Sequence, residues 1–125
     1  MKKPEIIEKY WYSIDWDVKK LWALDLPVES FPMKELEWHM DVPVWPFEGK
    51  GYCITPREVL NDPEKYHIEY ERTMKADTAF PIEIIRRDNC WMILDGIHRF
   101  LKTYKNDGTE INVRKVPEKY VVRLK

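Results

Sequence analysis

One junction constrains the fold of this chain more than any other. An apolar run at residues 91–94 leads through Asp95 and Gly96 into a segment with helical spacing. Four consecutive apolar residues indicate a strand that is covered on both faces. The helical face that follows consists of Ile97, Phe100, Leu101 and Tyr104. The sequence therefore predicts a buried strand that passes at once into an amphipathic helix.

Local signals set the ends of this helix and the chemistry of its first turn. We expect Asp95 to cap the N-terminus, Gly96 to allow a tight turn, and residues 106–108 to end the helix. His98 and Arg99 then lie beside unpaired backbone N–H groups, where a cation is unfavourable unless an anion is bound. An ordinary capped turn with a solvated His and Arg is the alternative. The predicted phosphate-binding residues are Gly96, Ile97, His98 and Arg99.

Residues 95–99 (Asp-Gly-Ile-His-Arg), with the helix after them and a strand at 111–116, resemble the core of the ParB/sulfiredoxin superfamily. Residues 81–85 are similar to the PI-x-V strand of that family, and residues 31–36 to the VPM-x-x-L entry strand of sulfiredoxins. The resemblance implies one α/β (α+β) domain over residues 1–125, with residues 1–30 as an aromatic-rich N-terminal extension. Helices would pack on a small mixed sheet. The expected strands are 82–86, 90–94 and 111–116, with another near 33–40.

The same resemblance implies a ligand. Sulfiredoxins use a G-C-H-R turn with ATP, ParB proteins a G-x-x-R turn within a CTP site, and archaeal free-serine kinases a D-G-x-H-R turn with ADP. Gly96, His98 and Arg99 match these patterns in whole or in part, and Asp95 matches the serine-kinase form. ATP or ADP, or else CTP, is the implied ligand, with Mg²⁺ on Asp95 in a catalytic version. Sulfiredoxin chemistry is not expected, because Ile97 stands where the cysteine nucleophile would fall. A complete partition protein is not expected either, because the chain ends soon after its last predicted strand.

Residues 36–44 alternate apolar and polar side chains, which is the pattern of a strand with one wet face. Glu37, His39 and Asp41 would then form a row that could hold a metal or supply a general base, or else a plain polar edge. In a helix, Glu37 and Asp41 would share a face and His39 would point elsewhere. In the serine kinases of the family, an acid shortly after the entry strand acts as the base on the substrate hydroxyl. That resemblance makes Asp41 the candidate base, Glu37 the second candidate, and His39 an accessory residue.

The middle of the chain carries helix signals. Residues 55–58 (Thr-Pro-Arg-Glu) form a capping box with Pro at the first helical position. Asp62-Pro63 starts a second helix, which we expect to run to about Asp77. Its expected buried stripe is Tyr66, Tyr70 and Met74. Arg72 and Lys75 lie on or beside this stripe, either as accessory phosphate contacts or as ordinary exposed cations.

Composition limits the remaining choices. The 125 residues carry a formal net charge of −1, so no overall charge attracts nucleic acid or an anionic membrane. No apolar run approaches the roughly 20 residues of a membrane span. Cys53 and Cys90 are far apart in sequence, and we expect reduced thiols in a cytoplasmic protein. The tryptophans between Trp11 and Trp38 either stack a nucleobase or close a small core.

Three functional classes follow. The first is a nucleotide-dependent phosphotransferase on a small hydroxyl-bearing molecule, in which the 96–98 amides, His98 and Arg99 hold phosphates. Asp95 would position Mg²⁺ or the acceptor, and Asp41 would take the hydroxyl proton. The second is a nucleotide-sensing or partner-binding module without turnover. The third is a ParB-like nuclease, against which the near-neutral charge counts. The candidate catalytic residues are Glu37, Asp41, Asp95 and His98.

Overall fold

The computed structural model of the protein describes residues 18–87 and 89–120. Residues 11–17 of the aromatic segment lie outside this range. The elements in chain order are α2 (Val18–Trp22), β1 (Val28–Pro32), the 3₁₀ helix η1 (Met33–Asp41), β2 (Trp45–Phe47), β3 (Lys50–Ile54), α3 (Pro56–Asn61), α4 (His67–Lys75), β4 (Ile82–Arg87), β5 (Cys90–Asp95), α5 (Ile97–Lys105) and β6 (Glu110–Lys115).

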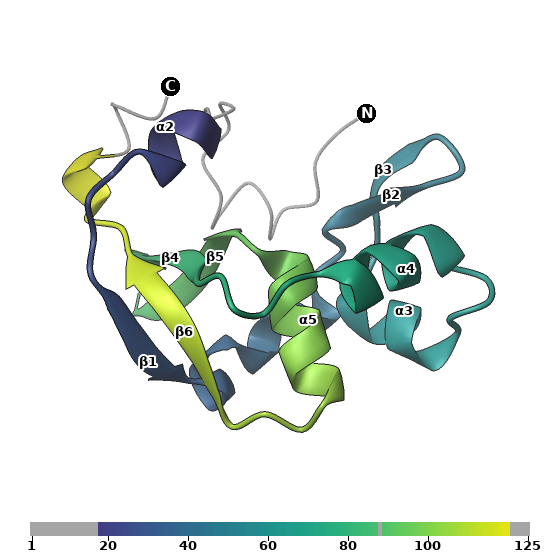
Figure 1. Cartoon of the computed structure of the whole chain (residues 1–125). Helices are drawn as coiled ribbons and strands as arrows, with labels where there is room; N and C mark the ends of the chain where they lie inside the picture. The colour runs from purple at the N-terminus through teal and green to yellow at the C-terminus, as the bar shows by residue number, and fades with distance from the viewer. Residues whose placement is uncertain (1–17, 88, 121–125) are drawn as a thin grey trace.

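The central element is a four-stranded mixed sheet with strand order β1-β6-β4-β5. The strands β4 and β5 form an antiparallel pair, and β1 is antiparallel to β6. Strand β6 is parallel to β4, and the crossover that joins these two parallel strands runs through β5 and α5. Strands β2 and β3 form a separate hairpin beside α3 and α4 (Figure 1). The predicted small α+β fold with a mixed sheet and packed helices is confirmed.

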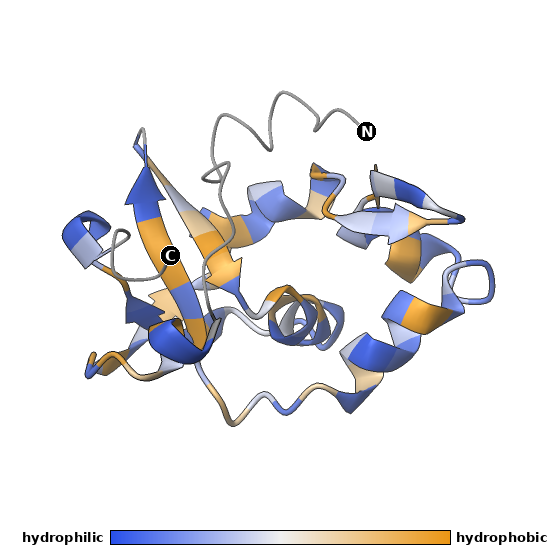
Figure 2. Ribbon diagram, turned by 90° about the horizontal axis from the view of Figure 1, so that it is seen from above, coloured by the Kyte–Doolittle hydropathy of each residue, from blue (hydrophilic) through white to orange (hydrophobic). Residues whose placement is uncertain are grey.

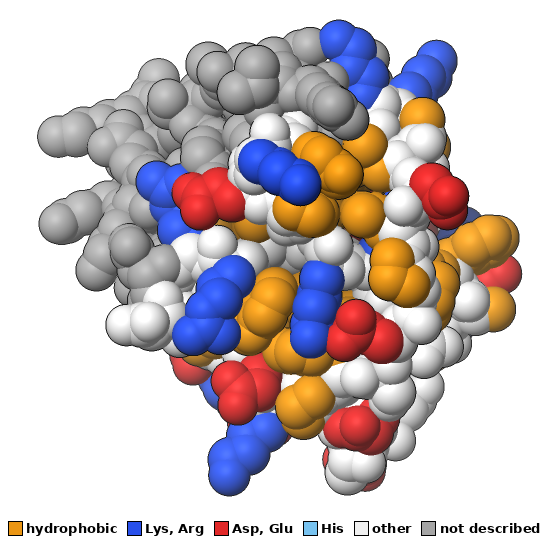
Figure 3. Space-filling view, turned by 90° about the vertical axis from the view of Figure 1, so that its left-hand side faces the viewer, with side chains coloured by type: hydrophobic (Ala, Val, Ile, Leu, Met, Phe, Trp, Pro, Cys, Tyr) orange, Lys and Arg blue, Asp and Glu red, His pale blue; other side chains and the backbone are white. Residues whose placement is uncertain are grey.

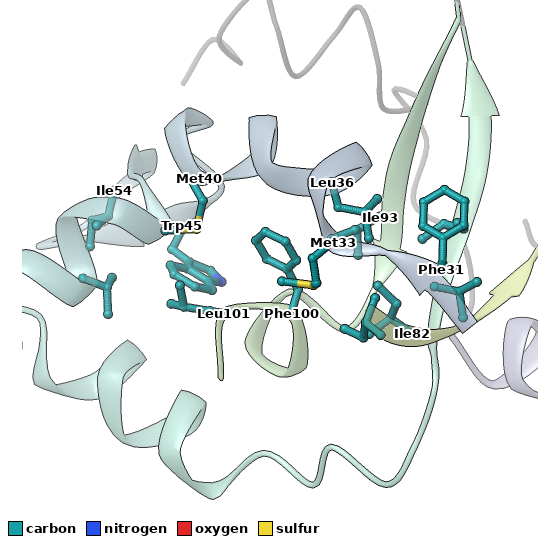
Figure 4. Packing of buried hydrophobic residues seen from close by; sticks show 14 residues of the cluster. Phe31, Met33, Leu36, Met40, Trp45, Ile54, Ile82, Ile93, Phe100 and Leu101 are labelled. Carbon is teal, nitrogen blue, oxygen red and sulfur yellow. The ribbon is translucent and has the colours of Figure 1, made fainter. Parts of the chain in front are cut away.

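Helix α5 lies between the sheet and the part of the molecule formed by α3, α4 and the β2–β3 hairpin (Figures 1 and 2). Its Phe100 and Leu101 are fully buried, with Ile97 and Tyr104 packed at the edge of the same cluster, as the helical spacing predicts. Figure 4 shows Phe100 close to Met33 in this core. A second apolar cluster joins α2 to the sheet. It comprises Leu21, Ile85, Met92, Leu94 and Val116.

The strand expected near residues 33–40 is wrong. These residues form η1, and the strand precedes them as β1, which pairs with β6. A 3₁₀ helix has three residues per turn, so Met33, Leu36 and His39 fall on one side, and all three are buried. Residues 18–30, assigned to an N-terminal extension, contribute α2 and most of β1 to the fold.

The first middle helix, α3, agrees with the sequence in its cap, whereas the second, α4, does not. The capping box is confirmed, because the Thr55 hydroxyl accepts from the Glu58 N–H and the Glu58 carboxylate accepts from the Thr55 N–H. Helix α4 begins at His67 with Tyr66 as its N-cap, so the expected start at Asp62-Pro63 is wrong; residues 63–66 form a turn instead. It ends at Lys75, slightly earlier than expected. Met74, expected to be buried, is exposed, whereas Glu69 and Thr73 are buried. The face of α4 toward α5 is therefore partly polar.

The surface is mixed in character. On the face shown in Figure 3, positive and negative side chains lie interspersed among apolar ones. Within residues 18–87 and 89–120, no helix has the length and apolar character that crossing a membrane requires. Cys53 and Cys90 do not form a disulfide with each other.

Candidate functional site

The junction of β5 and α5 is a tight turn that only glycine fits. Gly96 has φ of 109°, and a Cβ added there would lie 2.5 Å from Cγ2 of Ile82. Gly96, and not Asp95, is the N-cap residue, so the expected Asp95 cap is wrong. Asp95 is instead the last residue of β5. Since glycine has no side chain, no side-chain hydrogen bond from the N-cap residue occupies the first-turn N–H groups of α5.

A cavity of about 280 Å³ opens at this junction, and we call it the corner pocket. The described residues that line it are Trp45, Ala76, Leu94, Asp95, Gly96, Ile97, His98 and Arg99. The predicted residues Gly96, Ile97, His98 and Arg99 are thus brought together around one space, with Asp95 beside them. Trp45 from β2 and Ala76 after α4 complete its walls.

His98 is held between an aromatic ring and a buried carboxylate. Its imidazole stacks on the Trp45 indole, with ring centroids 4.8 Å apart and an interplanar angle of 16°. Its Nε2 lies 3.0 Å from Oε1 of Glu69, whose side chain is only 7% exposed. With Nε2–H donating to Glu69, a neutral imidazole presents Nδ1 as an acceptor. The sequence pattern missed Glu69, although it fixes His98 in place.

Arg99 and Asp95 form an ion pair at the edge of the corner pocket. The Arg99 guanidinium donates to Oδ2 of Asp95 at 3.3 Å and to the Pro81 carbonyl oxygen. The same Oδ2 accepts from Nε1 of Trp22 at 3.0 Å. Among the described residues, no group of three or more His, Cys, Asp or Glu side chains could hold a metal ion. Mg²⁺ on Asp95 stays a prediction.

Beneath this pair lies Glu83, a buried carboxyl group that the sequence pattern also missed. Glu83 sits on β4, opposite Asp95 of β5 and Arg114 of β6. Its Oε2 is 3.9 Å from the Arg114 guanidinium, and its Oε1 meets no hydrogen-bond donor in the described part of the chain. Burial, and then the negative charge of Asp95, raise the pKa of Glu83 to about 7.

His39 is a structural residue and does not belong to an exposed polar row. It is fully buried, its Nδ1 donates to the Leu36 carbonyl oxygen at 2.8 Å, and its Nε2 accepts from the Ile93 N–H at 2.9 Å. Burial lowers the pKa of His39 to about 4. The expected row of Glu37, His39 and Asp41 on one wet face is therefore wrong, because Glu37 and Asp41 are exposed and His39 is not.

Asp41 is positioned away from the corner pocket. It forms an exposed ion pair with Arg57 of α3 at 2.7 Å, and this hydrogen bond lowers the pKa of Asp41. Asp41 and then Tyr104 raise the pKa of Arg57, and Tyr104 lies seven residues after Ile97 and so about 10 Å further along α5. The structure does not bring Glu37, His39 or Asp41 to the corner.

The two accessory cations of α4 differ in position. Arg72 lies 3.6 Å from the Glu69 carboxylate, so it joins the group around His98, with its own side chain largely exposed. Lys75 is exposed and directly precedes Ala76, which lines the corner pocket. Of these two cations, Arg72 is therefore the one that contacts the group around His98, through Glu69.

A larger cavity of about 560 Å³, the hairpin pocket, lies between the β2–β3 hairpin and α4. Glu69 and Arg72 line it, so the Glu69–His98 hydrogen bond connects it with the corner pocket. Phe47 and Tyr66 contribute aromatic rings in an edge-to-face arrangement, with centroids 5.0 Å apart. The remaining described residues of its wall are Pro46, Glu48, Gly49, Ile54, Lys65, His67 and Ile68.

Comparisons of the chain with family models, with curated proteins and with solved structures found no match. Membership of the ParB/sulfiredoxin superfamily therefore stays a prediction from the motif at residues 95–99.

Proposed function

We propose that this protein binds a nucleotide, with its phosphates in the corner pocket and its nucleoside toward the hairpin pocket. The observation that carries the proposal is the convergence of uncapped first-turn N–H groups, His98 and Arg99 on one cavity. Backbone N–H groups and the positive end of a helix dipole favour phosphate oxygens. A guanidinium has five N–H donors, so Arg99 retains donors beyond those that bind Asp95 and Pro81.

The sizes of the two cavities support this placement. The corner pocket, at about 280 Å³, is just below the range of pockets that enclose a drug-sized ligand, but it has room for phosphate groups. The hairpin pocket is twice as large and carries the rings of Phe47 and Tyr66, on which a base could pack. Arg72 lines the hairpin pocket and contacts Glu69, the partner of His98, so it could contact either a phosphate or a ribose oxygen.

A specific observation favours phosphoryl transfer as the second candidate function. His98 is fixed by the buried Glu69 carboxylate, as a general base is fixed by an orienting acid in many enzymes. In a transferase, Nδ1 of His98 would accept the proton of an acceptor hydroxyl on a small molecule, while Arg99 and the N–H groups of α5 stabilise the phosphate charge. Asp95 then positions Arg99, and Asp41 has no role. The net charge of −1 does not favour a polyanionic substrate, so we do not propose a nuclease.

Ligand titration tests binding. ATP, ADP, CTP, GTP and inorganic phosphate are each titrated against the thermal unfolding of the full chain. A bound nucleotide at 100-fold excess over its Kd should add about 2.7 kcal/mol to the free energy of unfolding. We expect His98→Asn and Arg72→Gln to weaken binding, and Lys105→Gln, at the opposite end of α5, to leave it unchanged. The proposal fails if no nucleotide stabilises the protein, or if all three variants bind as the wild type does.

Product analysis tests transfer. The protein is incubated with ATP or ADP and with hydroxyl amino acids or sugars, and mass spectrometry then searches for a phosphorylated product. Glu69→Gln should lower kcat and change its pH profile while nucleotide affinity is retained, because Glu69 acts by positioning His98. Tight nucleotide binding without any phosphorylated product would support the nucleotide-binding function and rule out the transferase.

A further inference from the structure

A further cavity of about 460 Å³, which we call the α2 pocket, lies beside Arg99. The described residues that line it are Trp22, Phe80, Pro81, Glu83, Arg99 and Arg114. Arg99 lines both cavities, whereas Glu83 and Arg114 belong to the α2 pocket and have no place in the nucleotide site proposed above.

The floor of the α2 pocket is charged and buried. Asp95, Glu83 and Arg114 are neighbours across β5, β4 and β6. The side chain of Glu83 is 3% exposed, and its Oε1 meets no donor among the described residues. A proton on Glu83 would let it donate to the adjacent Asp95 carboxylate and would remove this unsatisfied acceptor. Two guanidinium groups, those of Arg99 and Arg114, then face one carboxylate, and one positive charge remains.

Burial supports the same protonation state, because it raises the pKa of Glu83 to about 7. The neighbouring Asp95 carboxylate acts in the same direction, and the two guanidinium groups act against it. Below about pH 7, the pocket therefore keeps a surplus positive charge on its floor, which one ligand anion would balance.

The walls of the α2 pocket are aromatic. Trp22 is 54% exposed and Phe80 is 64% exposed, and both flank this one cavity. The Trp22 indole is held in place by its hydrogen bond to Asp95. An apolar rim over a few convergent polar groups is the usual composition of a small-molecule site, and the volume suits a single ring with a short substituent.

We propose that the α2 pocket is a second ligand site, separate from the nucleotide site, and that it takes a small aromatic carboxylate. The ring lies between Trp22 and Phe80. The carboxylate accepts hydrogen bonds from N–H groups of Arg114 and Arg99, which retain donors beyond those that bind the carbonyl oxygens of Leu24 and Pro81.

The test uses benzoate and phenylacetate as probes, with benzyl alcohol and acetate as controls that lack the charge or the ring. The readout is the Trp22 indole N–H signal in a ¹H–¹⁵N spectrum of the full chain, assigned by its loss in Trp22→Phe. We expect a saturable shift of this signal with the two aromatic carboxylates and much weaker binding of both controls. The absence of saturable binding by the carboxylates, or equal binding of benzyl alcohol, would overturn the proposal.

Paired variants separate the α2 pocket from other sites. Arg114→Gln and Phe80→Ala should each weaken probe binding about ten-fold, through the lost charge-assisted hydrogen bond and the lost ring contact. Arg57→Gln and Met74→Ala are the matched controls at exposed positions elsewhere, and they should bind as the wild type does. Because Phe80 is mostly exposed, its variant keeps the test valid even if Arg114→Gln does not fold. Wild-type affinity in every folded pocket variant would reject the site. Nucleotide titration of the same variants keeps this outcome distinct from failure of the corner pocket.

Discussion

Replacing Glu83 with glutamine should make the protein more stable at high pH and leave it nearly unchanged at low pH. The carboxyl group is buried between Asp95 of β5 and Arg114 of β6, with Arg99 of α5 nearby. Glutamine has nearly the same shape, and its amide can donate to Asp95 and accept from Arg114 as a protonated Glu83 would. The variant therefore fixes the uncharged state at every pH.

The magnitude follows from the pKa. Burial moves the pKa of Glu83 from its ordinary value of 4.5 to about 7. Between these values the unfolded chain has released its proton and the folded protein still holds it, so the stability that Glu83 contributes falls as pH rises. At about 1.4 kcal/mol per pH unit, the loss amounts to about 3 kcal/mol above pH 7. Glu83→Gln does not undergo this loss.

Urea unfolding at a series of pH values, followed by tryptophan fluorescence and circular dichroism at constant ionic strength, measures the effect. The difference in unfolding free energy between variant and wild type should rise from near zero at pH 4.5 to about 3 kcal/mol above pH 7. Glu29→Gln removes an exposed glutamate that pairs with Lys115 on the surface, and its difference curve should stay nearly flat. A flat or falling difference curve for Glu83→Gln would refute the reasoning.

Three further outcomes are expected. His39, with its pKa lowered to about 4 from 6.5, should stay neutral by NMR at pH 5. As pH falls from 6.5 to 4, wild type should lose about 3 kcal/mol of unfolding free energy relative to His39→Gln, because only the unfolded chain is protonated at His39 there. The comparison with the variant removes the opposite contribution of Glu83, which both proteins share. Gly96→Ala should cost on the order of 3 kcal/mol in urea unfolding, through its positive φ and the contact with Ile82. Gly49→Ala has positive φ but open space, and should cost less. Asp41→Asn should change stability by under about 1 kcal/mol and leave nucleotide affinity intact, because Asp41 is exposed and distant from the corner pocket.

The sequence was sufficient to predict the β5–α5 junction because its signals are local and mutually consistent. A continuous apolar run, a glycine and an apolar stripe of helical spacing all indicate the same strand-turn-helix unit. Phe100 and Leu101 are buried as the spacing predicts, and the residues expected to bind phosphate surround one cavity. The cap was misplaced by one residue because Asp95 is held by Trp22 and Arg99, and neither contact appears in the local pattern.

The strand prediction near residues 33–40 is wrong because the apolar residues of this segment fit two different periods. An alternation of apolar and polar residues with a period of two predicts a strand. The buried positions Met33, Leu36 and His39 are instead spaced three residues apart, which is the period of a 3₁₀ helix. The two hydrogen bonds of His39, to Leu36 within η1 and to Ile93 on β5, satisfy both nitrogen atoms of the buried ring. Because the second of these partners is distant in sequence, a local pattern could not decide between the periods.

The buried carboxylates show a second limit of local patterns. Glu69 was assigned no role because the apolar stripe of α4 pointed to Met74, yet Glu69 is buried against His98 of α5. Glu83 did leave a signal, since it is the one charged residue in an otherwise apolar run at 82–85. A lone carboxylate in a strand covered on both faces requires a partner from elsewhere, and here the partners come from β5 and β6.

The carboxylates also explain how two basic side chains can occupy the first turn of α5. A positive charge at a helix N-terminus opposes the dipole, but Asp95 pairs with Arg99, and Glu69 accepts a hydrogen bond from His98. A phosphate that enters the corner pocket therefore does not meet two unpaired cations. It meets backbone N–H groups and the remaining donors of Arg99, with Arg72 within reach of the same carboxylate as His98. Affinity at this corner should accordingly come more from directed N–H donors than from net charge, and it should decline less with added salt than it would at a site built from exposed lysines.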